Sequence, residues 1–421
     1  MNRAPRIAIL GLLGSGNLGN HGSLDAMLQF LRAEHPDSQI TCVCSGPAEV
    51  ERQYGIPSFS ITWYHPGRAG RSRLVTIALK AFGKVADLVR TPRWVRRYDI
   101  VIIPGMGVLE TTLQLQPWGW PYALFLVFAW ARVFGVRTAL VSVGANVPRE
   151  RSIRMLFAGT AKFASYRSFR DTDSRDALRQ MGLDAGADAI YPDLAFALPL
   201  PKPADAPVIA PTVRTVGLGV MAYRGTNADR SRSGEVYEAY VRKMIDFSRW
   251  LVDQGYRVRL LTGDPSDEAV VSAVVDDLRR TRPGVVDALL IREPAESLSE
   301  LMEQMAGVDL VVASRYHNVL SALKLSKPTI SISYARKNDI LMEDMRLGEF
   351  RQPIQSLDVQ RLIEQFRALE ARASRLEPEM HRRNAEYVKL LEQQNAALSA
   401  TLFGAAAPKR SAAGGAESKE A

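Results

Sequence analysis

The fold is decided by residues 6–19, which read RIAILGLLGSGNLG. The run from Ile7 to Leu13 is almost continuously apolar, as in a strand that is buried on both faces of a parallel sheet. Apolar residues of 24–31 then recur at helical spacing, with Ser23 available as the N-cap. A strand, a glycine-rich turn and a helix in this order are typical of α/β proteins.

The same alternation of strand and helix continues along the chain. A proline-rich stretch over 198–211 can continue neither element and predicts a linker between two domains. We therefore expect an α/β protein with two Rossmann-like domains that face each other across a cleft. The expected strands are 7–13, 39–45, 99–103, 137–143, 215–221, 256–262, 287–292, 308–313 and 328–333. The expected units are an N-terminal domain (1–198), a linker (199–211), a C-terminal domain (212–355), a helical segment (356–403) and a disordered tail (404–421).

Composition and charge exclude several classes of protein. The chain has 421 residues, of which 47% are hydrophobic and 24% charged. This excludes a single small module and a wholly disordered chain. The net charge is +9, and the segment 68–97 alone holds nine basic residues and one acid, Asp87, which gives it a net charge of +8. Such a local excess favours a docking surface for something anionic and disfavours nucleic acid, which would need a more even basic coat.

The basic segment has a helical pattern of its own. Apolar residues of 74–89 recur at helical spacing, while Lys80 and Lys84 lie together on another face. Aromatic residues border the segment at positions 63, 64 and 94. This is the pattern of a helix that lies in a membrane interface. A core helix with a solvated basic face fits the pattern equally well, so both interpretations stay open.

The sequence predicts no membrane-spanning helix. Its most apolar stretch, Trp118 to Trp130, falls short of the ~20 residues that a spanning helix needs. Cys42 and Cys44 lie too close together for an easy disulfide in a strand and are expected as core residues in a reducing compartment. We therefore expect a cytoplasmic protein that is either free or peripheral at a membrane.

Two glycine loops follow predicted strands. Residues 14–19, GSGNLG, match the G-x-G-x-x-G turn of dinucleotide-binding proteins. The acid that would hold a ribose is missing at the end of the second strand, which disfavours a nicotinamide cofactor. The loop remains a candidate contact for a sugar or an anion, as does a second loop at 104–107 on the same sheet edge. Asn17 and His21 would either hydrogen-bond a ligand or cap the turn.

Two acidic patterns bear on a nucleotide-sugar donor. Asp171 and Asp173 have the D-x-D spacing that some glycosyltransferases use for a metal, but a helical pattern follows them, so they are expected as helix caps. The E-x7-E pair of many nucleotide-sugar transferases is absent, because none of the glutamates at 293, 296 and 300 has an acid eight positions on. Both observations weaken the case for such a donor.

The most informative segment is 308–318, which reads VDLVVASRYHN. A buried strand brings Arg315 and His317 to its carboxyl end, where a helix begins. Arg315 can hold a carboxylate or phosphate through two parallel hydrogen bonds, and the helix N-terminus adds backbone donors. His317 can exchange a proton near neutral pH. The next strand brings Arg336 and Lys337 to the same edge of the sheet.

In this order the motifs resemble those of the polysaccharide pyruvyl transferase family. Each motif is weak alone, and their order and spacing make the resemblance specific. The sequence departs from the family where members often have Gly-Asp-Glu-Ala after the first loop and Arg-Leu-His in place of Arg315-Tyr316-His317. The motifs that carry the resemblance are residues 14–19, 99–107, 168–178, 192–196 and 314–337.

The resemblance implies a GT-B-like pair of domains and the transfer of a pyruvyl group from phosphoenolpyruvate to two hydroxyls of a sugar. The products would be a pyruvate ketal and phosphate, and neither a metal nor a nucleotide would be needed. His317 is the candidate general acid, which would protonate the methylene carbon of the donor. The candidate donor-binding residues are Arg315, Lys337, Arg170 and Asn318. The candidate residues of the acceptor-side loops are Gly14, Gly16, Asn17, His21, Gly105 and Gly107.

The expected acceptor is a polysaccharide or its lipid-linked precursor, in the biosynthesis of exopolysaccharide or of a cell-surface glycan. A lipid-linked acceptor would explain segment 68–97 as a contact with an anionic membrane. The alternative is a GT-B glycosyltransferase with a nucleotide-sugar donor. A binding module without catalytic activity is the third interpretation.

Overall fold

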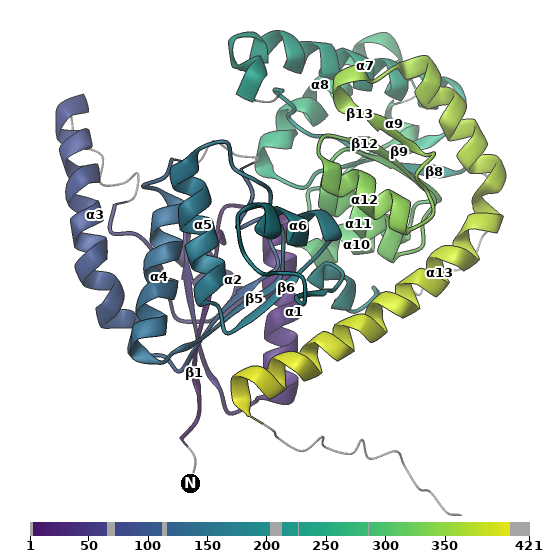
Figure 1. The fold of residues 1–421 in the computed structure, drawn as a ribbon. Coiled ribbons are helices and arrows are strands. Elements are labelled where there is room, and N and C mark those ends of the chain that lie inside the picture. Colours follow the sequence, from purple (N-terminus) through teal and green to yellow (C-terminus); the bar gives the residue numbers. More distant parts are fainter. Residues whose placement is uncertain are drawn as a thin grey trace, which may run out of the picture.

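The computed structural model describes residues 3–64, 72–111, 116–202, 213–225, 227–284 and 286–404. These residues form two α/β domains, each built on a parallel sheet that is covered by helices (Figure 1). The two domains face each other, as the sequence predicts, and a long C-terminal helix connects them on one side (Figure 1). The arrangement is that of a GT-B-like protein.

The N-terminal domain has a seven-stranded parallel sheet in the order β3-β2-β1-β4-β5-β6-β7. Its strand β1 (Arg6–Gly11) is fully buried from Ile7 onward, because it has a strand on each side and helices on both faces. This explains its apolar sequence. The other elements are α1 (Leu18–Glu34), β2 (Gln39–Cys44), α2 (Pro47–Tyr54), β3 (Ser58–Ser60), α3 (Arg73–Val95), β4 (Ile100–Pro104), α4 (Trp120–Phe134), β5 (Arg137–Val143), α5 (Arg151–Phe163), β6 (Tyr166–Phe169), α6 (Thr172–Gln180) and β7 (Ala189–Ile190).

The C-terminal domain repeats the same plan with six strands in the order β10-β9-β8-β11-β12-β13. Its central strands β8 and β11 are buried along their whole length. The elements are β8 (Thr215–Gly219), α7 (Ser233–Asp253), β9 (Arg257–Leu261), the short η4 (Pro265–Asp267), α8 (Glu268–Thr281), α9 (Val286–Leu289), β10 (Leu290–Arg292), α10 (Leu298–Ala306), β11 (Leu310–Ala313), α11 (Tyr316–Lys324), β12 (Thr329–Ser333), α12 (Arg336–Asp344) and β13 (Arg351–Pro353).

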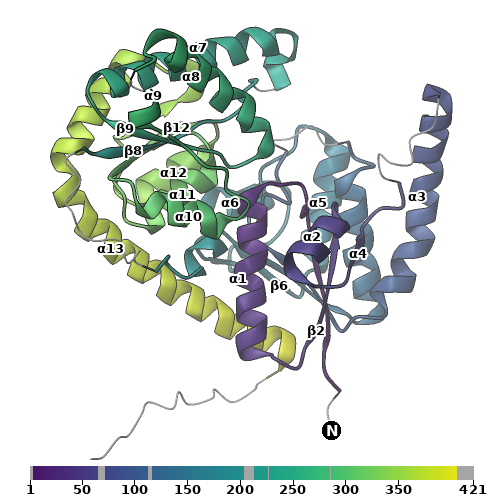
Figure 2. The same cartoon turned by 180° about the vertical axis from the view of Figure 1, so that it is seen from behind.

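Helix α13 (Val359–Phe403) joins the two domains. Its first half packs on the C-terminal domain and its second half runs back along the N-terminal domain, as Figures 1 and 2 show from opposite sides. Leu398 and Leu402 are fully buried in the second half. Phe403 stacks on His35 at the end of α1, with ring centroids 3.5 Å apart. The last helix therefore ends on the domain in which the chain begins.

Several predictions from the sequence can be compared directly with these elements. All nine expected strands have a counterpart, but the strand expected at 287–292 is confirmed only over β10, because 287–289 belong to helix α9. Four short strands that the sequence did not predict, β3, β6, β7 and β13, extend the two sheets. The helix expected over 356–403 is α13. Most of the expected linker and all but one residue of the expected tail lie outside the described residues. Cys42 and Cys44 are buried and form no disulfide. No helix within the described ranges is long and apolar enough to cross a membrane.

A hydrogen-bonded contact fixes α13 to the N-terminal sheet. Gln394 is fully buried, and its Nε2 donates to Ser142 Oγ at 2.8 Å and to Ser168 Oγ at 2.9 Å. Ser142 belongs to β5 and Ser168 to β6, so one amide joins the helix to two strands.

We expect the substitution Gln394→Leu to lower the free energy of unfolding by about 1–3 kcal/mol, because both hydrogen bonds are lost inside the protein. Urea unfolding followed by circular dichroism measures the change. Gln393→Leu, on the exposed side of the same helix, is the matched control and should change stability by less than about 0.5 kcal/mol. An equal effect of both substitutions would show that this contact does not stabilise the interface.

Candidate active site

The two domains present the carboxyl ends of their strands to each other. In each sheet the strand order reverses beside the first strand: the chain adds strands on one side of it and then continues on the other. The reversal lies between β1 and β4 in the first sheet and between β8 and β11 in the second. The loops leave toward opposite sides at such a point, and α/β proteins bind ligands in the crevice between them. The segments that follow β4, β6, β7, β11 and β12 meet at this place.

A buried ionic cluster lies where these segments meet. Arg170, directly after β6, is buried, and its Nη2 donates to Glu110 Oε1. Its Nη1 and Nε lie 3.7 Å from carboxylate oxygens of Asp193 and Asp171. Lys337 of α12 donates from Nζ to the second oxygen of Glu110 at 3.5 Å. Glu110 thereby links a guanidinium of its own domain to an ammonium of the other domain.

This pairing sets the ionisation of the cluster. Burial alone would raise the pKa of Glu110, but the charges of Arg170 and Lys337 lower it to about 2. Burial also disfavours the charged forms of Arg170 and Lys337, and the Glu110 carboxylate outweighs it and raises the pKa of both groups. All three groups are therefore charged at neutral pH.

An aromatic ring completes the environment of both cations. The ring centroid of Tyr316, the first residue of α11, lies 5.1 Å from Arg170 Cζ and 5.4 Å from Lys337 Nζ. The ring of Tyr334 lies 5.5 Å from the same ammonium. Cations are stabilised over the faces of aromatic rings. Burial raises the pKa of the Tyr316 hydroxyl well above its ordinary value, so the phenol stays neutral.

His317 enters the cluster from the first turn of α11. Its Nε2 lies 3.9 Å from Asp193 Oδ2 and has no hydrogen-bond partner among the described residues. Burial lowers the pKa of the imidazole to about 4; the Asp193 carboxylate opposes this shift, and the charges of Lys337 and Arg170 add to it. The imidazole is therefore neutral at pH 7 in this state of the protein.

The N-terminal domain contacts His317 through a glycine. Gly19 lies in the first turn of α1, and a Cβ atom at this position would overlap the imidazole of His317. Since only glycine lacks a Cβ, no other residue fits here unless the imidazole moves. The third glycine of the G-x-G-x-x-G pattern thus makes room for the candidate acid of the other domain.

The rest of this loop is also part of the domain interface. Leu18 N–H donates to Gly263 O of the C-terminal domain at 3.2 Å. Gly16 has a φ of +80°, and a Cβ there would lie 2.8 Å from Pro265 Cγ. The first backbone donor of α1 is therefore occupied by protein, and the contact of this loop with an anion or a sugar stays a prediction that does not include Leu18 N–H.

Asn17 and His21, the two polar candidates of the acceptor-side loop, serve as caps. The side chain of Asn17 accepts a hydrogen bond from Asn20 N–H at 3.2 Å and begins α1. His21 is buried, and its Nε2 accepts a hydrogen bond from Gly14 N–H at 3.2 Å. Of the two alternatives that the sequence left open, the capping role is the one observed.

The second glycine loop makes room for other side chains. A Cβ at Gly105 would lie 2.6 Å from Ser23 Oγ, and one at Gly107 would lie 2.6 Å from the carboxylate of Glu110. These glycines therefore admit the close approach of α1 and of Glu110, and neither of them lines the two cavities described below.

Arg315 lies next to the cluster and holds a carboxylate of its own domain. Its Nε and Nη2 donate to Asp267 over distances of 2.6 to 3.2 Å. Burial disfavours its charge, but the hydrogen bonds to Asp267 raise its pKa. Arg315 is the N-cap residue of α11, and no side chain caps that helix. Its Nη1 makes no hydrogen bond within the described part of the chain.

Asn318, the remaining donor-side candidate, lies behind this helix N-terminus. It is fully buried against Gly219 and Gly263, and both of its amide atoms lack a partner among the described residues. Neither Asn318 nor Arg315 lines the two cavities at the cluster. The structure thus brings His317, Lys337 and Arg170 together, and it places Arg315 beside them and Asn318 in the interior.

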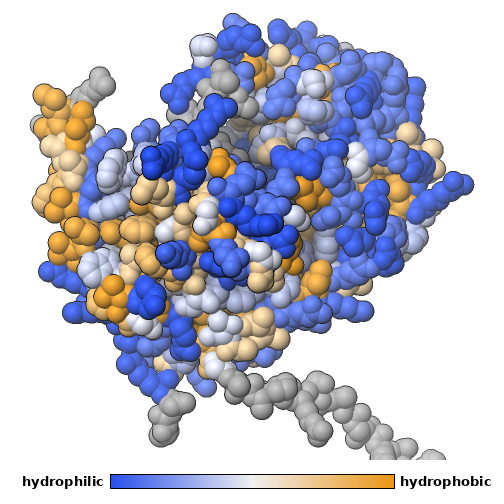
Figure 3. All heavy atoms as spheres, in the orientation of Figure 1, coloured by the Kyte–Doolittle hydropathy of each residue, from blue (hydrophilic) through white to orange (hydrophobic). Residues whose placement is uncertain are grey.

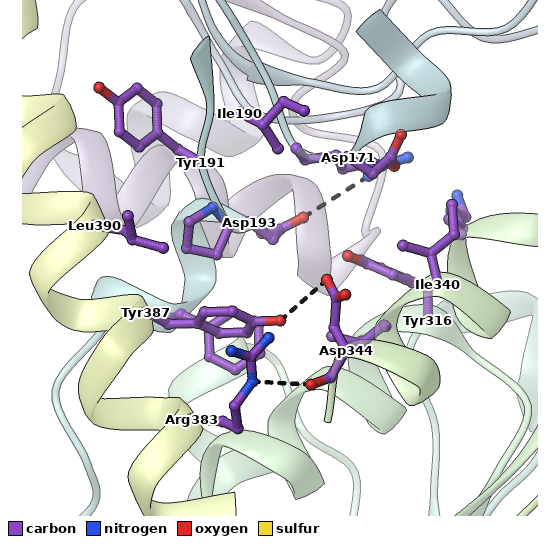
Figure 4. Close-up of a pocket in the computed structure, with 15 residues that line it drawn as sticks. Asp171, Ile190, Tyr191, Asp193, Tyr316, Ile340, Asp344, Arg383, Tyr387 and Leu390 are labelled. Atoms are coloured by element: carbon purple, nitrogen blue, oxygen red, sulfur yellow. Dashed lines mark hydrogen bonds and ion pairs between the residues drawn. The ribbon is translucent and has the colours of Figure 1, made fainter. Parts of the chain in front are cut away.

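Two cavities flank the ionic cluster. The first has a volume of about 170 Å³ and is closed by α13, from which Arg383 and Tyr387 reach Asp344 (Figure 4). The second is a groove of about 420 Å³ between the domains. Its N-terminal wall is acidic and its C-terminal wall basic, and Arg336 and Asp173 form an ion pair of 3.3 Å across it. Lys337 lines both cavities.

Glu110 and Asp193 were assigned no role from the sequence. Glu110 stands three positions after Gly107, in the loop that follows β4, and this position was its only signal. Asp193 lies within the motif 192–196, which carries no chemical pattern of its own. Asp171 caps α6 by accepting a hydrogen bond from Ser174 N–H at 2.7 Å, as the sequence predicts. The described residues contain no group of three or more His, Cys, Asp or Glu that could hold a metal ion.

Fold and site together define a GT-B-like protein of two α/β domains with a candidate active site at the domain interface. Similar solved structures include a putative UDP-N-acetylglucosamine 2-epimerase from Listeria monocytogenes, which is 13% identical with a TM-score of 0.63 and coverage of 96% of this chain and 99% of that one. S. aureus MnaA in complex with UDP is 11% identical, with a TM-score of 0.59 and coverage of 95% and 98%. Anabaena HepE in complex with UDP-glucose is 12% identical, with a TM-score of 0.56 and coverage of 95% and 100%. These likenesses show the fold.

The family is given by the sequence. The family model for polysaccharide pyruvyl transferase matches residues 17–336, and the chain belongs to this family. A comparison with curated proteins finds no match. The match covers the ionic cluster of both domains, including Glu110, Arg170, Asp193 and His317, and ends one residue before Lys337.

We expect Glu110→Gln to lower the free energy of unfolding by about 3–5 kcal/mol, because the buried charges of Arg170 and Lys337 lose their shared partner. The pKa of Glu110 is lowered in the folded protein, so its contribution is full above about pH 5 and is lost as the pH falls toward 2. Urea unfolding at several pH values should show the two proteins converging toward low pH.

Asp173→Asn is the matched control, because it removes an ion pair between the same domains whose two side chains are exposed. Solvent screens such a pair, so this variant should remain close to the parent protein at every pH. A loss of stability as large as that of Glu110→Gln would show that burial of the cluster does not determine its strength.

Proposed function

We propose that this protein transfers a pyruvyl group from phosphoenolpyruvate to a sugar of a polysaccharide or of its lipid-linked precursor. The products are a pyruvate ketal and phosphate. The observation that carries the proposal is the position of His317, whose Nε2 lies 3.9 Å from the Asp193 carboxylate of the other domain and has no hydrogen-bond partner in the described part of the chain. The charges of Lys337 and Arg170 act on the same imidazole. Membership of the polysaccharide pyruvyl transferase family supports the same reaction.

The donor carries a phosphate and a carboxylate on one small molecule, so it needs positive charge at more than one point. Lys337 lines the groove between the domains, and Arg336 stands at the same wall. Arg315 has a free Nη1 edge next to the uncapped N-terminus of α11, whose backbone N–H groups favour an anion. The buried Arg170 is balanced by carboxylates and serves to position Glu110 and Tyr316.

The proposed reaction moves two protons and opens the C=C double bond of the donor. It also replaces the one C–O bond to phosphate by two C–O bonds to the sugar. His317 gives a proton to the methylene carbon of the donor, which becomes a methyl group, and the neighbouring carbon becomes electrophilic. One sugar hydroxyl adds to that carbon, and a second hydroxyl then displaces phosphate. Of the two hydroxyl protons, one returns to His317 and the other leaves with phosphate. No resident metal or nucleotide takes part in this scheme.

The electrostatics of the site make the role of His317 as an acid depend on the donor. Burial and nearby cations keep His317 neutral at pH 7, with a pKa of about 4. An anion bound close to the imidazole favours its charged form and raises the pKa. His317 therefore takes up a proton together with the donor, so that the acid is formed only when its substrate is present.

The groove of about 420 Å³ is the proposed acceptor site. Its N-terminal wall carries Asn146, Asp173, Asp176 and Gln180, whose oxygen and nitrogen atoms suit the hydroxyls of a sugar. An acceptor linked to a lipid would place the enzyme at the cytoplasmic face of a membrane. The alternative function is a glycosyltransferase with a nucleotide-sugar donor, which the UDP-bound structures of similar fold favour.

Incubation with phosphoenolpyruvate and a set of glycan acceptors tests the proposed function. We expect phosphate release that depends on the acceptor, and a product whose mass equals acceptor plus pyruvate minus water. The control replaces phosphoenolpyruvate by UDP-sugars. Turnover of a UDP-sugar with the same acceptors, and none of phosphoenolpyruvate, would support the alternative and contradict the proposal.

The variant His317→Gln should still bind phosphoenolpyruvate, while kcat falls by about 10²–10⁴-fold, because general acid catalysis is lost. Calorimetry at pH 6 in buffers of different ionisation enthalpy should show less proton uptake on binding than in the parent protein. Subtracting the proton uptake of the variant from that of the parent protein cancels the contribution of the donor's own phosphate, because that contribution is the same in both.

The matched control is His381→Gln, since His381 lies on the exposed face of α13. It should retain both the turnover and the proton uptake of the parent protein. Equal proton uptake by the His317→Gln variant and the parent would contradict the role of His317 as the acid.

A further inference from the structure

Helix α3 turns its apolar side away from the protein. A surface helix of a globular protein normally buries its apolar stripe. In α3 the apolar side chains are exposed, up to 79% for Leu74 and 61% for Val85, and they form the hydrophobic edge of the molecule in Figure 3. We name these residues the α3 stripe: Leu74, Val75, Ile77, Phe82, Val85, Leu88 and Val89.

The opposite side of α3 explains this orientation. Gly83, Asp87 and Thr91 recur every fourth residue and are buried. Asp87 Oδ1 accepts a hydrogen bond from Trp63 N–H at 2.7 Å, and a Cβ at Gly83 would lie 3.0 Å from Tyr64 Cβ. From Gly83 to Thr91 the helix is thus held to the domain by small and polar residues, and in its last turn by the buried Trp94 and Val95. This contact fixes its rotation and leaves the apolar side in solvent.

The size of the α3 stripe marks it as an interaction surface. From Leu74 to Val89 the helix rises by roughly 22 Å, at 1.5 Å per residue. Single exposed apolar residues are common on proteins, but a continuous patch along a whole helix is characteristic of a surface that binds a partner. Of the two interpretations of segment 68–97, the structure excludes the buried core helix over the residues that it describes.

We propose that the α3 stripe inserts into the interface of a lipid bilayer that carries anionic headgroups. Lys80, Arg93, Arg96 and Arg97 are exposed along and just beyond the helix. The single acid of the segment, Asp87, is buried beneath it. An apolar face bordered by cations matches the acyl boundary and the anionic headgroups of a membrane. A second copy of the chain would instead bring these like charges together.

The position of α3 in the molecule agrees with binding to a lipid bilayer. The helix follows β3 and runs back along the parallel sheet, so it begins at the edge where the strands end. Its first turns project beyond the rest of the N-terminal domain at that end, in both views of the fold (Figures 1 and 2). A projecting helix can reach a flat surface without a matching groove. The cleft between the domains opens at the same edge of the sheet.

Co-sedimentation with vesicles tests the surface. We expect the full chain to bind vesicles of phosphatidylglycerol and phosphatidylcholine, to bind phosphatidylcholine alone much less, and to dissociate at high salt. The double variant Ile77→Ser, Val85→Ser should bind at least about tenfold more weakly, because two inserted aliphatic side chains are lost. Leu200→Ser, Val388→Ser is the matched control and should bind like the parent protein, since both residues are exposed elsewhere.

The cations are tested in the same assay. The triple variant Lys80→Gln, Arg93→Gln, Arg96→Gln should lose about fivefold in affinity per charge. The matched control Arg361→Gln, Arg375→Gln, Lys389→Gln removes three exposed cations of α13 and should leave binding unchanged. Binding that survives both α3 variants would overturn the proposal. A dimer in light scattering that the Ile77→Ser, Val85→Ser variant dissociates would overturn it in favour of a second copy.

Pyruvyl transfer to a water-soluble acceptor separates this result from the proposed function. The α3 variants should keep the parent rate with such an acceptor, because the stripe does not contact the cluster around His317. Loss of vesicle binding at an unchanged rate supports the lipid surface, whereas an equal loss of rate would show that the variants disturb the fold and would contradict a separate docking surface.

Discussion

The carboxylate of Glu110 lies between Arg170 of its own domain and Lys337 of the other, and the site is built around this pairing. Charges inside a protein are costly unless each has a partner, and the ionised Glu110 is the partner that Arg170 and Lys337 share. Their charges lower the pKa of Glu110 to about 2 and help to keep His317 neutral. This pairing therefore contributes both to the docking of the domains and, through its two cations, to the neutral state of the candidate acid.

The glycines of the first loop adapt a common sequence pattern to this interface. In a dinucleotide-binding protein the third glycine serves close packing of helix and strand. Here Gly19 admits the imidazole of His317, and Leu18 N–H is bonded to Gly263 O across the interface. The cleft is narrow at this loop and widens beside Lys337, where the two cavities lie. A motif that is recognised by its spacing has thus become part of a domain contact.

The sequence predicted those parts of the fold that depend on continuous burial. Strand β11, and β1 from Ile7 onward, have no polar side chain because they lie inside their sheets. Strand β6 instead contains Arg167 and Ser168, whose side chains bond Asp188 and Gln394, and this polar sequence concealed the strand. The same reasoning brought His317 and Lys337 to one edge, since parallel strands end together. Their carboxylate partners escaped prediction because Glu110 and Asp193 come from loops of the N-terminal domain, which reach His317 and Lys337 only when the two domains pack.

The sequence also could not predict the rotation of α3 about its own axis. The helical spacing of its apolar residues does not show which face of the helix is turned toward the domain. This rotation depends on Asp87 and Gly83 and on their contacts with residues 63 and 64, which no periodicity encodes. A helical pattern shows that a helix has two faces, and the local hydrogen bonds determine which of them is turned inward.

The stacking of Phe403 on His35 has a practical consequence for handling the molecule. It holds Gly404, the last described residue, beside the end of α1, at the edge of the N-terminal sheet where the strands begin (Figure 2). A purification handle or a surface tether joined directly to Gly404, in place of residues 405–421, is therefore attached to the side opposite the cleft. Protein immobilised in this way presents both the domain interface and the projecting end of α3 to the solution.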